Sequence, residues 1–174
     1  DAIHAGIGFI TEDRKTEGLL LDKSIAQNIE LANLDRVSNR GVISNAKRNT
    51  LVKQGIEEFR IRCFNADQEC GSLSGGNQQK VVIAKWVYKQ PKILILDEPT
   101  RGVDIGAKKE IYNIINQLAA QGVAIILVSS ELPEVLGMSD RIMVVCEGRV
   151  TGIVNAAEAD QAKIMTLATG GNIA

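Results

Sequence analysis

The second half of the chain alternates between short apolar runs and amphipathic segments. From residue 92 onward the pattern predicts strands over 93–96 and 123–128. Between them it predicts a helix with apolar positions at Ile111, Ile114, Ile115 and Leu118. Continuous apolar strands separated by amphipathic helices are typical of a parallel sheet covered on both faces. We therefore expect an α/β fold with a mostly parallel sheet flanked by helices.

Shorter elements follow toward the C-terminus. Residues 142–145 are expected to form another buried strand, and Glu147-Gly148 predicts a hairpin turn into a strand over 149–154. A last helix is expected from about Ala156 to Ala168. Gly170-Gly171 is a natural stop for it.

The first half begins with a strand-like segment and then turns helical. Gly6 to Thr11 predicts a strand, followed by a charged loop from Glu12 to Gly18. Ser24-Ile25-Ala26-Gln27 matches a capping box, which predicts a helix that starts after Ser24. A second helix is expected after Ser44. Residues from about 20 to 90 are thus predicted to be mostly helical.

These patterns suggest how one domain, residues 1–174, is organised. Residues 1–19 and 91–154 are expected to form the sheet core, and residues from about 20 to 90 a helical region. Residues 155–174 are expected to form a C-terminal helix and tail. A length of 174 residues fits one domain of ordinary size.

Composition and charge exclude several classes of protein. Hydrophobic residues make up 45% of the chain and charged residues 24%, which argues against disorder. The net charge of −1 offers no broad basic field, so nucleic acid is not an expected partner. Cys63, Cys70 and Cys146 show no C-x-x-C spacing, and His4 is the sole histidine. We expect reduced thiols in a cytosolic protein.

The chain shows no signal for membrane insertion. No apolar stretch approaches the roughly 20 residues that a membrane helix needs. The sequence opens with Asp1-Ala2-Ile3, without a starting Met, and runs directly into a strand-like segment. We expect it to be a piece of a longer polypeptide.

One run of residues places a hydroxyl and two glycines at the start of a helix. It is Leu73-Ser74-Gly75-Gly76-Asn77-Gln78-Gln79-Lys80. Unpaired N–H groups and the positive end of the macrodipole can hold a phosphate at such a helix N-terminus, and glycines let the backbone approach it. The alternative is that Ser74 is only a helix N-cap.

A second run ends a buried strand in two carboxylates. In Leu94-Ile95-Leu96-Asp97-Glu98-Pro99-Thr100 the acidic pair suits magnesium and an attacking water. Adjacent strand-end residues point to opposite sides, so one carboxylate can face a metal and the other a reacting phosphate. A phosphate-binding loop would have the form G-x-x-x-x-G-K-[ST], and no glycine here is followed directly by lysine. Half of a nucleotide site is therefore missing.

The two runs together resemble the signature and Walker B motifs of ATP-binding-cassette proteins. The form GGNQQK, followed by Asp97 to Lys108, is similar to the second nucleotide-binding domain of bacterial monosaccharide importers, in which two cassettes are fused. The resemblance covers the chain from Gly6 onward. It implies an incomplete P-loop-NTPase-like cassette with a helical subdomain. It also implies an ATPase that uses ATP and Mg²⁺ to drive import of ribose, galactose, xylose or related solutes.

The resemblance assigns roles to individual residues. Asp97 would hold magnesium through water, and Glu98 would polarise the attacking water as general base. The signature would contact ATP bound to the opposite cassette through Ser74, Gly75, Gly76, Asn77 and Gln78.

Of three further positions, Glu12 and Ser130 depart from the usual family pattern, and Asp104 ends a loop, Arg101-Gly102-Val103-Asp104, where the family more commonly has Ser-Ala-Leu-Asp. Asp104 would belong to the loop that contacts the opposite cassette, and it also suits the N-cap of the next helix. Glu12 stands at the Q-loop glutamine position, where it can accept from magnesium-bound water but brings a charge. Ser130 stands at the switch-histidine position. It is too short and too weakly basic to replace an imidazole, so a helix N-cap is the better interpretation.

These departures fall unevenly between the two sites of a cassette pair. In this family each site combines the phosphate loop and Walker B of one cassette with the signature of the other. Glu12, Asp97, Glu98 and Ser130 would share a site with two irregular members. The intact signature would complete the other site. Our hypothesis is that this domain contributes more to hydrolysis through its signature than through its own site.

The resemblance implies partners at the cytoplasmic face of the bacterial inner membrane. They are the other cassette of the fused polypeptide, a transmembrane permease subunit and, indirectly, a periplasmic or extracellular solute-binding protein. The helical region up to about Lys80 would meet the permease. A solvated helical face is the alternative interpretation of that region.

Two other functions remain open. A cassette ATPase of DNA repair would place a long coiled coil between Glu12 and Ser74, and this chain has no sustained heptads there. A non-catalytic regulatory or dimerisation module is favoured by Glu12 and Ser130 and opposed by Glu98. Without a phosphate loop, the chain alone is expected not to hydrolyse ATP. Its exposed apolar strand edges are expected to make it marginally stable or self-associating.

Overall fold

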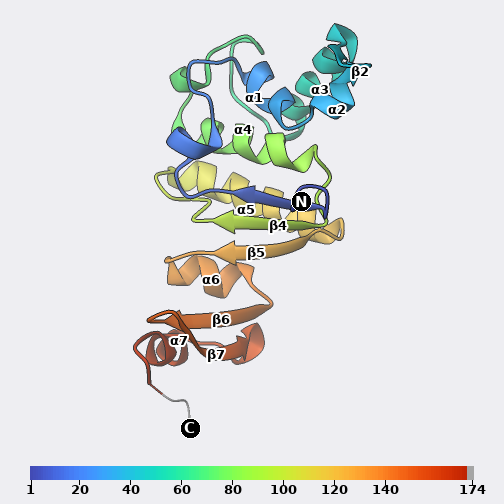
Figure 1. Ribbon diagram of the computed structural model, residues 1–174. Coiled ribbons are helices and arrows are strands. Elements are labelled where there is room, and N and C mark those ends of the chain that lie inside the picture. Colours follow the sequence, from blue (N-terminus) through green and yellow to red (C-terminus); the bar gives the residue numbers. More distant parts are fainter. Residues whose placement is uncertain (172–174) are drawn as a thin grey trace. The chain divides into compact units, whose positions relative to one another are not determined.

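A computed structural model describes residues 1–171 of the chain and divides it into two compact units (Figure 1). The first unit comprises Asp1–Val128, and the second begins at Ser129. The last three residues of the expected C-terminal tail lie outside the described residues.

The first unit is built on a parallel sheet of three strands. They are β1 (Ile7–Ile10), β4 (Ile93–Asp97) and β5 (Ala124–Val128), and β4 lies in the centre. All three lie within or close to the predicted apolar runs. The predicted α/β fold with parallel strands is confirmed.

The two faces of this sheet differ in burial. Ile10, Leu94 and Leu96 are fully buried on one face. On the other face Phe9 is 44% exposed and Ile126 is 51% exposed. The expectation of a sheet covered on both faces was therefore wrong for one face of the described sheet. The expectation came from the continuous apolar runs of the strands, which are typical of strands buried on both faces. In this structure the residues on one face of the sheet remain partly exposed.

Five α-helices accompany the sheet in the first unit. They are α1 (Ile25–Leu31), α2 (Leu34–Val37), α3 (Asn45–Glu58), α4 (Gly75–Val87) and α5 (Ile105–Ala120). Helix α1 packs against both α3 and α4, and α4 also contacts β1 (Figure 1). The apolar positions predicted to face the core are buried in α5: Ile111, Ile114, Ile115 and Leu118.

The capping box predicted at the start of α1 is present. The Ser24 hydroxyl accepts a hydrogen bond from the backbone N–H of Gln27 at 3.1 Å. In return the Gln27 side chain accepts from the backbone N–H of Ser24 at 3.0 Å. Two N–H groups that the helix leaves unpaired are satisfied in this way, which explains why α1 begins here.

One local expectation in the first half was wrong. The segment Arg14–Gly18 forms a π-helical turn, η1, and not an open loop. The Asp13 carboxylate accepts from the N–H groups of Lys15 and Thr16 at its start. The region from about 20 to 90 is mostly helical, with a short hairpin of β2 (Ser38–Asn39) and β3 (Val42–Ile43) between α2 and α3. A short 3-10 helix, η2 (Cys70–Ser72), precedes α4.

The second unit combines a hairpin with two helices. Its elements are α6 (Leu132–Met138), β6 (Arg141–Cys146), β7 (Arg149–Asn155) and α7 (Gln161–Ala168). The predicted turn is present, with positive φ values of 48° at Glu147 and 75° at Gly148. Two-residue hairpin turns favour such values because they match the twist of the strands. A 3-10 turn, η3 (Ala156–Glu158), precedes α7, so the last helix starts later than expected.

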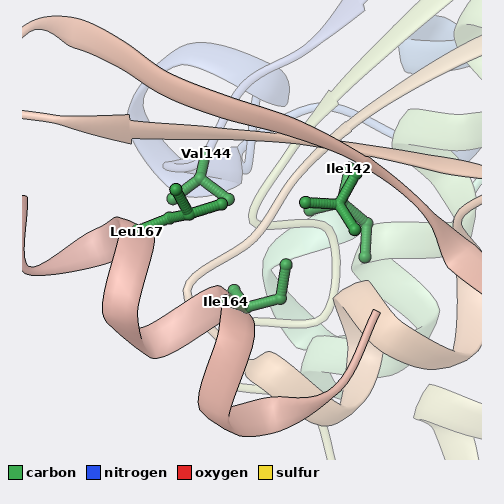
Figure 2. Packing of buried hydrophobic residues seen from close by; sticks show 5 residues of the cluster. Ile142, Val144, Ile164 and Leu167 are labelled. Atoms are coloured by element: carbon green, nitrogen blue, oxygen red, sulfur yellow. The ribbon is translucent and has the colours of Figure 1, made fainter. Parts of the chain in front are cut away.

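A small apolar core holds the second unit together. Figure 2 shows Ile142 and Val144 of β6 facing Ile164 and Leu167 of α7, and Val154 of β7 completes the cluster. The intervening β6 residues, Met143 and Val145, are exposed. The expected buried strand is therefore buried on one face only, the face against which α7 packs.

The three cysteines of the chain are free thiols. Burial raises the pKa of the Cys70 thiol to about 11, so it stays protonated at neutral pH. In the part of the chain that the structure describes, no helix has the length and apolar character needed to cross a membrane.

Candidate functional site

Helix α4 presents its N-terminus through the Ser-Gly-Gly run. Ser74 takes the N-cap position, and its carbonyl accepts the first helical bond from the Gln78 N–H at 2.9 Å. The Ser74 side chain is exposed and makes no capping bond to the helix backbone. Its hydroxyl instead accepts from the Asn77 amide at 3.0 Å. The N–H groups of the first turn therefore have no partner within the helix.

The opposite side of the same motif is anchored inside the protein. The Asn77 side chain accepts from the backbone N–H of Arg62 at 2.9 Å. Gln78 is buried, and its amide donates to the Cys70 carbonyl at 3.2 Å. Of the five signature residues predicted to meet a nucleotide, Asn77 and Gln78 thus make hydrogen bonds to the backbone of other segments. Ser74 and Gly75 lie at or near the surface.

A buried lysine ties α4 to α5. The Lys80 side chain is 2% exposed, and its ammonium group forms an ion pair with Glu110 and donates to the Arg60 carbonyl at 3.1 Å. Arg62 lies farther from Glu110, at 3.5 Å. The hydrogen bond from Lys80 holds the pKa of the Glu110 carboxyl below its ordinary value. A lysine this deeply buried is rare without such a partner.

The two glycines of the motif have a packing role that the sequence did not indicate. A Cβ added at Gly76 would overlap the Cβ of Ala107 near the start of α5. A Cβ at Gly75 would lie 2.8 Å from the Arg14 guanidinium and 3.0 Å from the Gly102 carbonyl oxygen. The start of α4 can therefore approach its neighbours only because both residues lack a side chain.

The acidic pair at the end of β4 has a different setting. Asp97 is the last residue of the strand and pairs with Val128 in register. Glu98 follows with a left-handed φ of 45°, and its N–H donates to the Val128 carbonyl at 2.9 Å. Strand alternation predicts that the two carboxylates point to opposite sides of the sheet. Alternation does not extend to Glu98, because its backbone has left the extended conformation.

Asp104 caps α5. Its carboxylate accepts from the N–H of Ala107 at 3.0 Å, which confirms the interpretation as an N-cap. The same carboxylate lies near the signature, 3.8 Å from the position that a Cβ at Gly76 would take. Contact of Asp104 with an opposite cassette stays a prediction.

The loop after β1 reaches the segment that precedes α5. The Glu12 carboxylate forms an ion pair with the Arg101 guanidinium. Arg14 donates to the backbone carbonyl of Arg101 at 2.7 Å and to that of Gly102 at 3.3 Å. Sequence reasoning missed both arginines. No local pattern marks contacts between residues so far apart along the chain.

These contacts bring three segments of the first unit together. We call this meeting point the three-segment junction, and it consists of Glu12–Arg14, Ser74–Gly76 and Arg101–Asp104. Of the predicted site residues, it includes the Q-loop position, the start of the signature and the loop that ends in Asp104.

Ser130 belongs to the second unit. The N-cap residue of α6 is Glu131, and the Ser129 hydroxyl accepts from the Glu131 N–H at 3.0 Å. The interpretation of Ser130 as a helix N-cap was therefore wrong by one residue. The turn that leads into α6 uses the preceding serine instead.

The acidic residues have different capacities to hold magnesium. Within residues 1–171 no cluster of three or more histidine, cysteine, aspartate or glutamate side chains is arranged to hold a metal ion. The half-buried carboxylate of Asp97 fits a contact through water, with the other oxygen ligands supplied by a nucleotide and solvent. Glu12 fits less well, because Arg101 already balances its charge.

Comparison with curated proteins finds close relatives over nearly the whole chain. The ribose import ATP-binding protein RbsA of Bacillus subtilis (strain 168) is 58% identical over 171 residues, which is 98% of this chain. The protein of the same name from Lactococcus lactis subsp. cremoris (strain SK11) is 55% identical over 98% of the chain. The chain spans only about 35% of the length of each of these relatives.

Solved structures share the fold at low sequence identity. The ATP-binding cassette MJ0796, in a dimeric post-hydrolysis state bound to ADP and Pi, aligns with a TM-score of 0.73 at 23% identity, covering 86% of this chain and 62% of that chain. MJ1267, an ATP-binding cassette of an ABC transporter, aligns with a TM-score of 0.72 at 21% identity, covering 95% of this chain and 69% of that one. Residues 1–101 match the family model described as ABC transporter. The chain belongs to the ABC transporter family.

Proposed function

We propose that this chain is part of the ATP-hydrolysing subunit that drives import of ribose or a related sugar. The observation that carries the proposal is its 58% identity, over 98% of its length, to the ribose import ATP-binding protein of Bacillus subtilis. The longer polypeptide to which it would belong is called the parent protein below. The parent would act at the cytoplasmic face of the membrane, together with a second cassette, a permease subunit and a solute-binding protein.

The start of α4 is suited to bind phosphate from a second cassette. Its first-turn N–H groups and the exposed Ser74 hydroxyl can donate to phosphate oxygens. The positive end of the helix dipole favours the negative charge that spreads over a transferring phosphoryl group. Gly75 contributes a half-exposed backbone without a side chain in the way. Gln78, because it is buried, would support this surface from behind.

The end of β4 would supply the chemistry of the chain's own site. Asp97 would hold Mg²⁺ through water, and the bound ion would neutralise phosphate charge. Glu98 would accept a proton from the attacking water as general base. Its left-handed backbone sets the direction of the Glu98 side chain just after the central strand, β4. Glu12 would reach this site only if its pair with Arg101 opened.

The proposal is tested with the parent protein and its permease in liposomes. ATP hydrolysis and uptake of labelled ribose are measured together, for the unchanged protein and for Ser74→Arg. The arginine would fill the space that a phosphate needs at α4, so both activities should fall at least about 100-fold. Thr166→Arg is the control, since Thr166 is exposed in the second unit and has no assigned role.

Absence of ATP hydrolysis in the unchanged parent would reject the proposal. Hydrolysis with uptake of a different solute would reject only the assignment to ribose. The chain alone is expected to release no phosphate from ATP. It contains no glycine-lysine pair to hold the β- and γ-phosphates in line.

A second candidate is a regulatory or dimerisation cassette that does not itself take part in hydrolysis. The engagement of Glu12 with Arg101 favours it, because this pair removes a magnesium contact from the chain's own site. In that case neither Ser74→Arg nor Glu98→Gln would change the turnover of the parent. A loss of turnover in either variant excludes this candidate.

A further inference from the structure

Arg14 lies against both of the other segments of the three-segment junction. Its two terminal nitrogens donate to consecutive carbonyl oxygens, at 2.7 Å to Arg101 and 3.3 Å to Gly102. One of these nitrogens would also lie 2.8 Å from a Cβ at Gly75. The guanidinium therefore fills the space between the signature helix and the Arg101–Asp104 segment.

Arg14 is half-buried, and its guanidinium is held by two bonds to consecutive backbone carbonyls. Its Nε is buried and has no hydrogen-bond partner among the described residues. Leaving a buried donor without a partner is unfavourable. The planar fork of arginine matches two neighbouring carbonyls, whereas a lysine ammonium offers a single point of attachment.

We propose that Arg14 is a positioning residue that holds the start of α4 in register with the Arg101–Asp104 segment. This inference rests on the proposed function, in which α4 completes a nucleotide site on a second cassette. Through Arg14, the Ser74 hydroxyl and the first-turn N–H groups keep the geometry that the transition state requires. Arg14 itself does not touch the nucleotide.

The packing around Arg14 explains how removing its side chain would change the position of the signature at the start of α4. Without it, the carbonyl oxygens of Arg101 and Gly102 lose charged donors, and that backbone is free to shift. The Gly102 carbonyl oxygen lies 3.0 Å from the position that a Cβ at Gly75 would take. A shift of the Gly102 backbone therefore changes the packing at the start of α4. Small displacements of positioned groups lower catalytic rates far more than they weaken substrate binding.

The ion pair between Glu12 and Arg101 provides a matched control. Arg14 binds the backbone carbonyl of Arg101, whereas Glu12 binds its side chain. Arg101→Gln therefore removes the ion pair and leaves both bonds from Arg14 available. Comparing Arg14→Ala with Arg101→Gln therefore separates the effect of the hydrogen bonds from Arg14 from the effect of the ion pair between Glu12 and Arg101.

The test measures kcat and KM for ATP in the parent protein with its permease. Arg14→Ala should lower kcat about 10- to 100-fold and change KM less than about 2-fold, as expected when positioning in the transition state is lost. Arg14→Lys should lose about 3- to 10-fold, because lysine can replace one of the two bonds. Arg101→Gln should stay within about 3-fold of the unchanged protein.

Hydrogen exchange in the same variants gives a readout that does not depend on activity. Arg14→Ala should speed exchange of backbone amides at 75–77 and 101–104, and Arg101→Gln should not. A kcat within 2-fold of the unchanged protein for Arg14→Ala would overturn the inference. If that variant does not fold, unchanged kcat and exchange in Arg14→Lys would overturn it. If Ser74→Arg loses activity while the Arg14 variants keep normal kcat and exchange, the inference about Arg14 is overturned and the proposed function is not affected.

Discussion

The start of α4 and the end of β4 carry the two motifs, and the protein holds them in different ways. The start of α4 is fixed by side chains, through Asn77, Gln78 and the buried Lys80. Its glycines are pressed against the segment before α5 and against Arg14. The surface that would meet a second cassette is therefore already shaped within this chain.

The end of β4 is marked by an unusual backbone conformation. Glu98 donates its N–H to Val128, accepts from the Arg101 N–H at 3.1 Å and keeps a left-handed φ of 45°. Asp97 belongs to the sheet face on which Phe9 and Ile126 are half-exposed. Under the proposed function, this difference means that the chain is better prepared to complete another cassette's site than to run its own. Its own site needs a phosphate loop that this sequence does not contain.

The largest effect on stability is expected at Gly76. Alanine normally stabilises a helix relative to glycine, but here its Cβ would overlap Ala107. Gly76→Ala should therefore lower the free energy of unfolding by about 1–3 kcal/mol, measured by urea denaturation. Gly137→Ala, in α6 with open space around it, should instead gain up to about 1 kcal/mol. Equal gains in both would show that α4 is not closely packed at its start.

Breaking the ion pair behind the signature should have the next largest effect. Glu110→Gln leaves the Lys80 ammonium buried, with the Arg60 carbonyl as its remaining hydrogen-bond acceptor among the described residues. Because Glu110 is 35% exposed and water can reach it, a loss of only about 1–2 kcal/mol is expected in the same assay. Arg62→Gln, at a side chain that is 82% exposed, should change stability by less than about 0.5 kcal/mol. A larger loss of stability for Arg62→Gln than for Glu110→Gln would show that Arg62, and not Lys80, is the main partner of Glu110.

A smaller effect, of opposite sign, is expected at the end of β4. A left-handed backbone is unfavourable for glutamate and easy for glycine, so Glu98→Gly should raise the free energy of unfolding by about 0.5–1 kcal/mol. Gln90, with a φ of 55°, is the control, and Gln90→Gly should gain a similar amount. If Glu98→Gly is destabilising while Gln90→Gly is not, the side chain of Glu98 holds the strand end in addition to its backbone.

The smallest effect concerns pH. The pKa of Glu110 is lowered in the folded protein, so its pair with Lys80 stabilises the fold above the ordinary carboxyl pKa. This contribution is lost as the pH falls through the lowered value and the carboxylate takes up a proton. The stability difference between the unchanged chain and Glu110→Gln should therefore shrink from about pH 5 to pH 3. A difference that grows toward low pH would contradict the stated sign.

Local patterns in the sequence were enough for much of the fold. The spacing of Ile111, Ile114, Ile115 and Leu118 predicted the buried face of α5. Ser24 and Gln27 predicted a helix start, and Glu147-Gly148 a hairpin, because these signals depend on neighbouring residues. Ser74, Asp97 and Asp104 were recognised as motif residues, although their roles toward a nucleotide stay predictions.

The remaining features depend on contacts that no local pattern encodes. Arg14 and Arg101 meet only after folding has brought the end of β1 close to the segment before α5. The packing role of Gly76 depends on Ala107, which lies on another helix. The left-handed backbone of Glu98 could not be expected either, since glutamate rarely adopts it.

The most direct test compares the turnover of the parent protein in two variants, Ser74→Arg and Glu98→Gln. The first blocks the surface at the start of α4, and the second removes the proposed base of the chain's own site. We predict a loss of at least about 100-fold for Ser74→Arg and less than about 5-fold for Glu98→Gln. The reverse order would show that the chain's own site carries most of the hydrolysis, and would contradict the account.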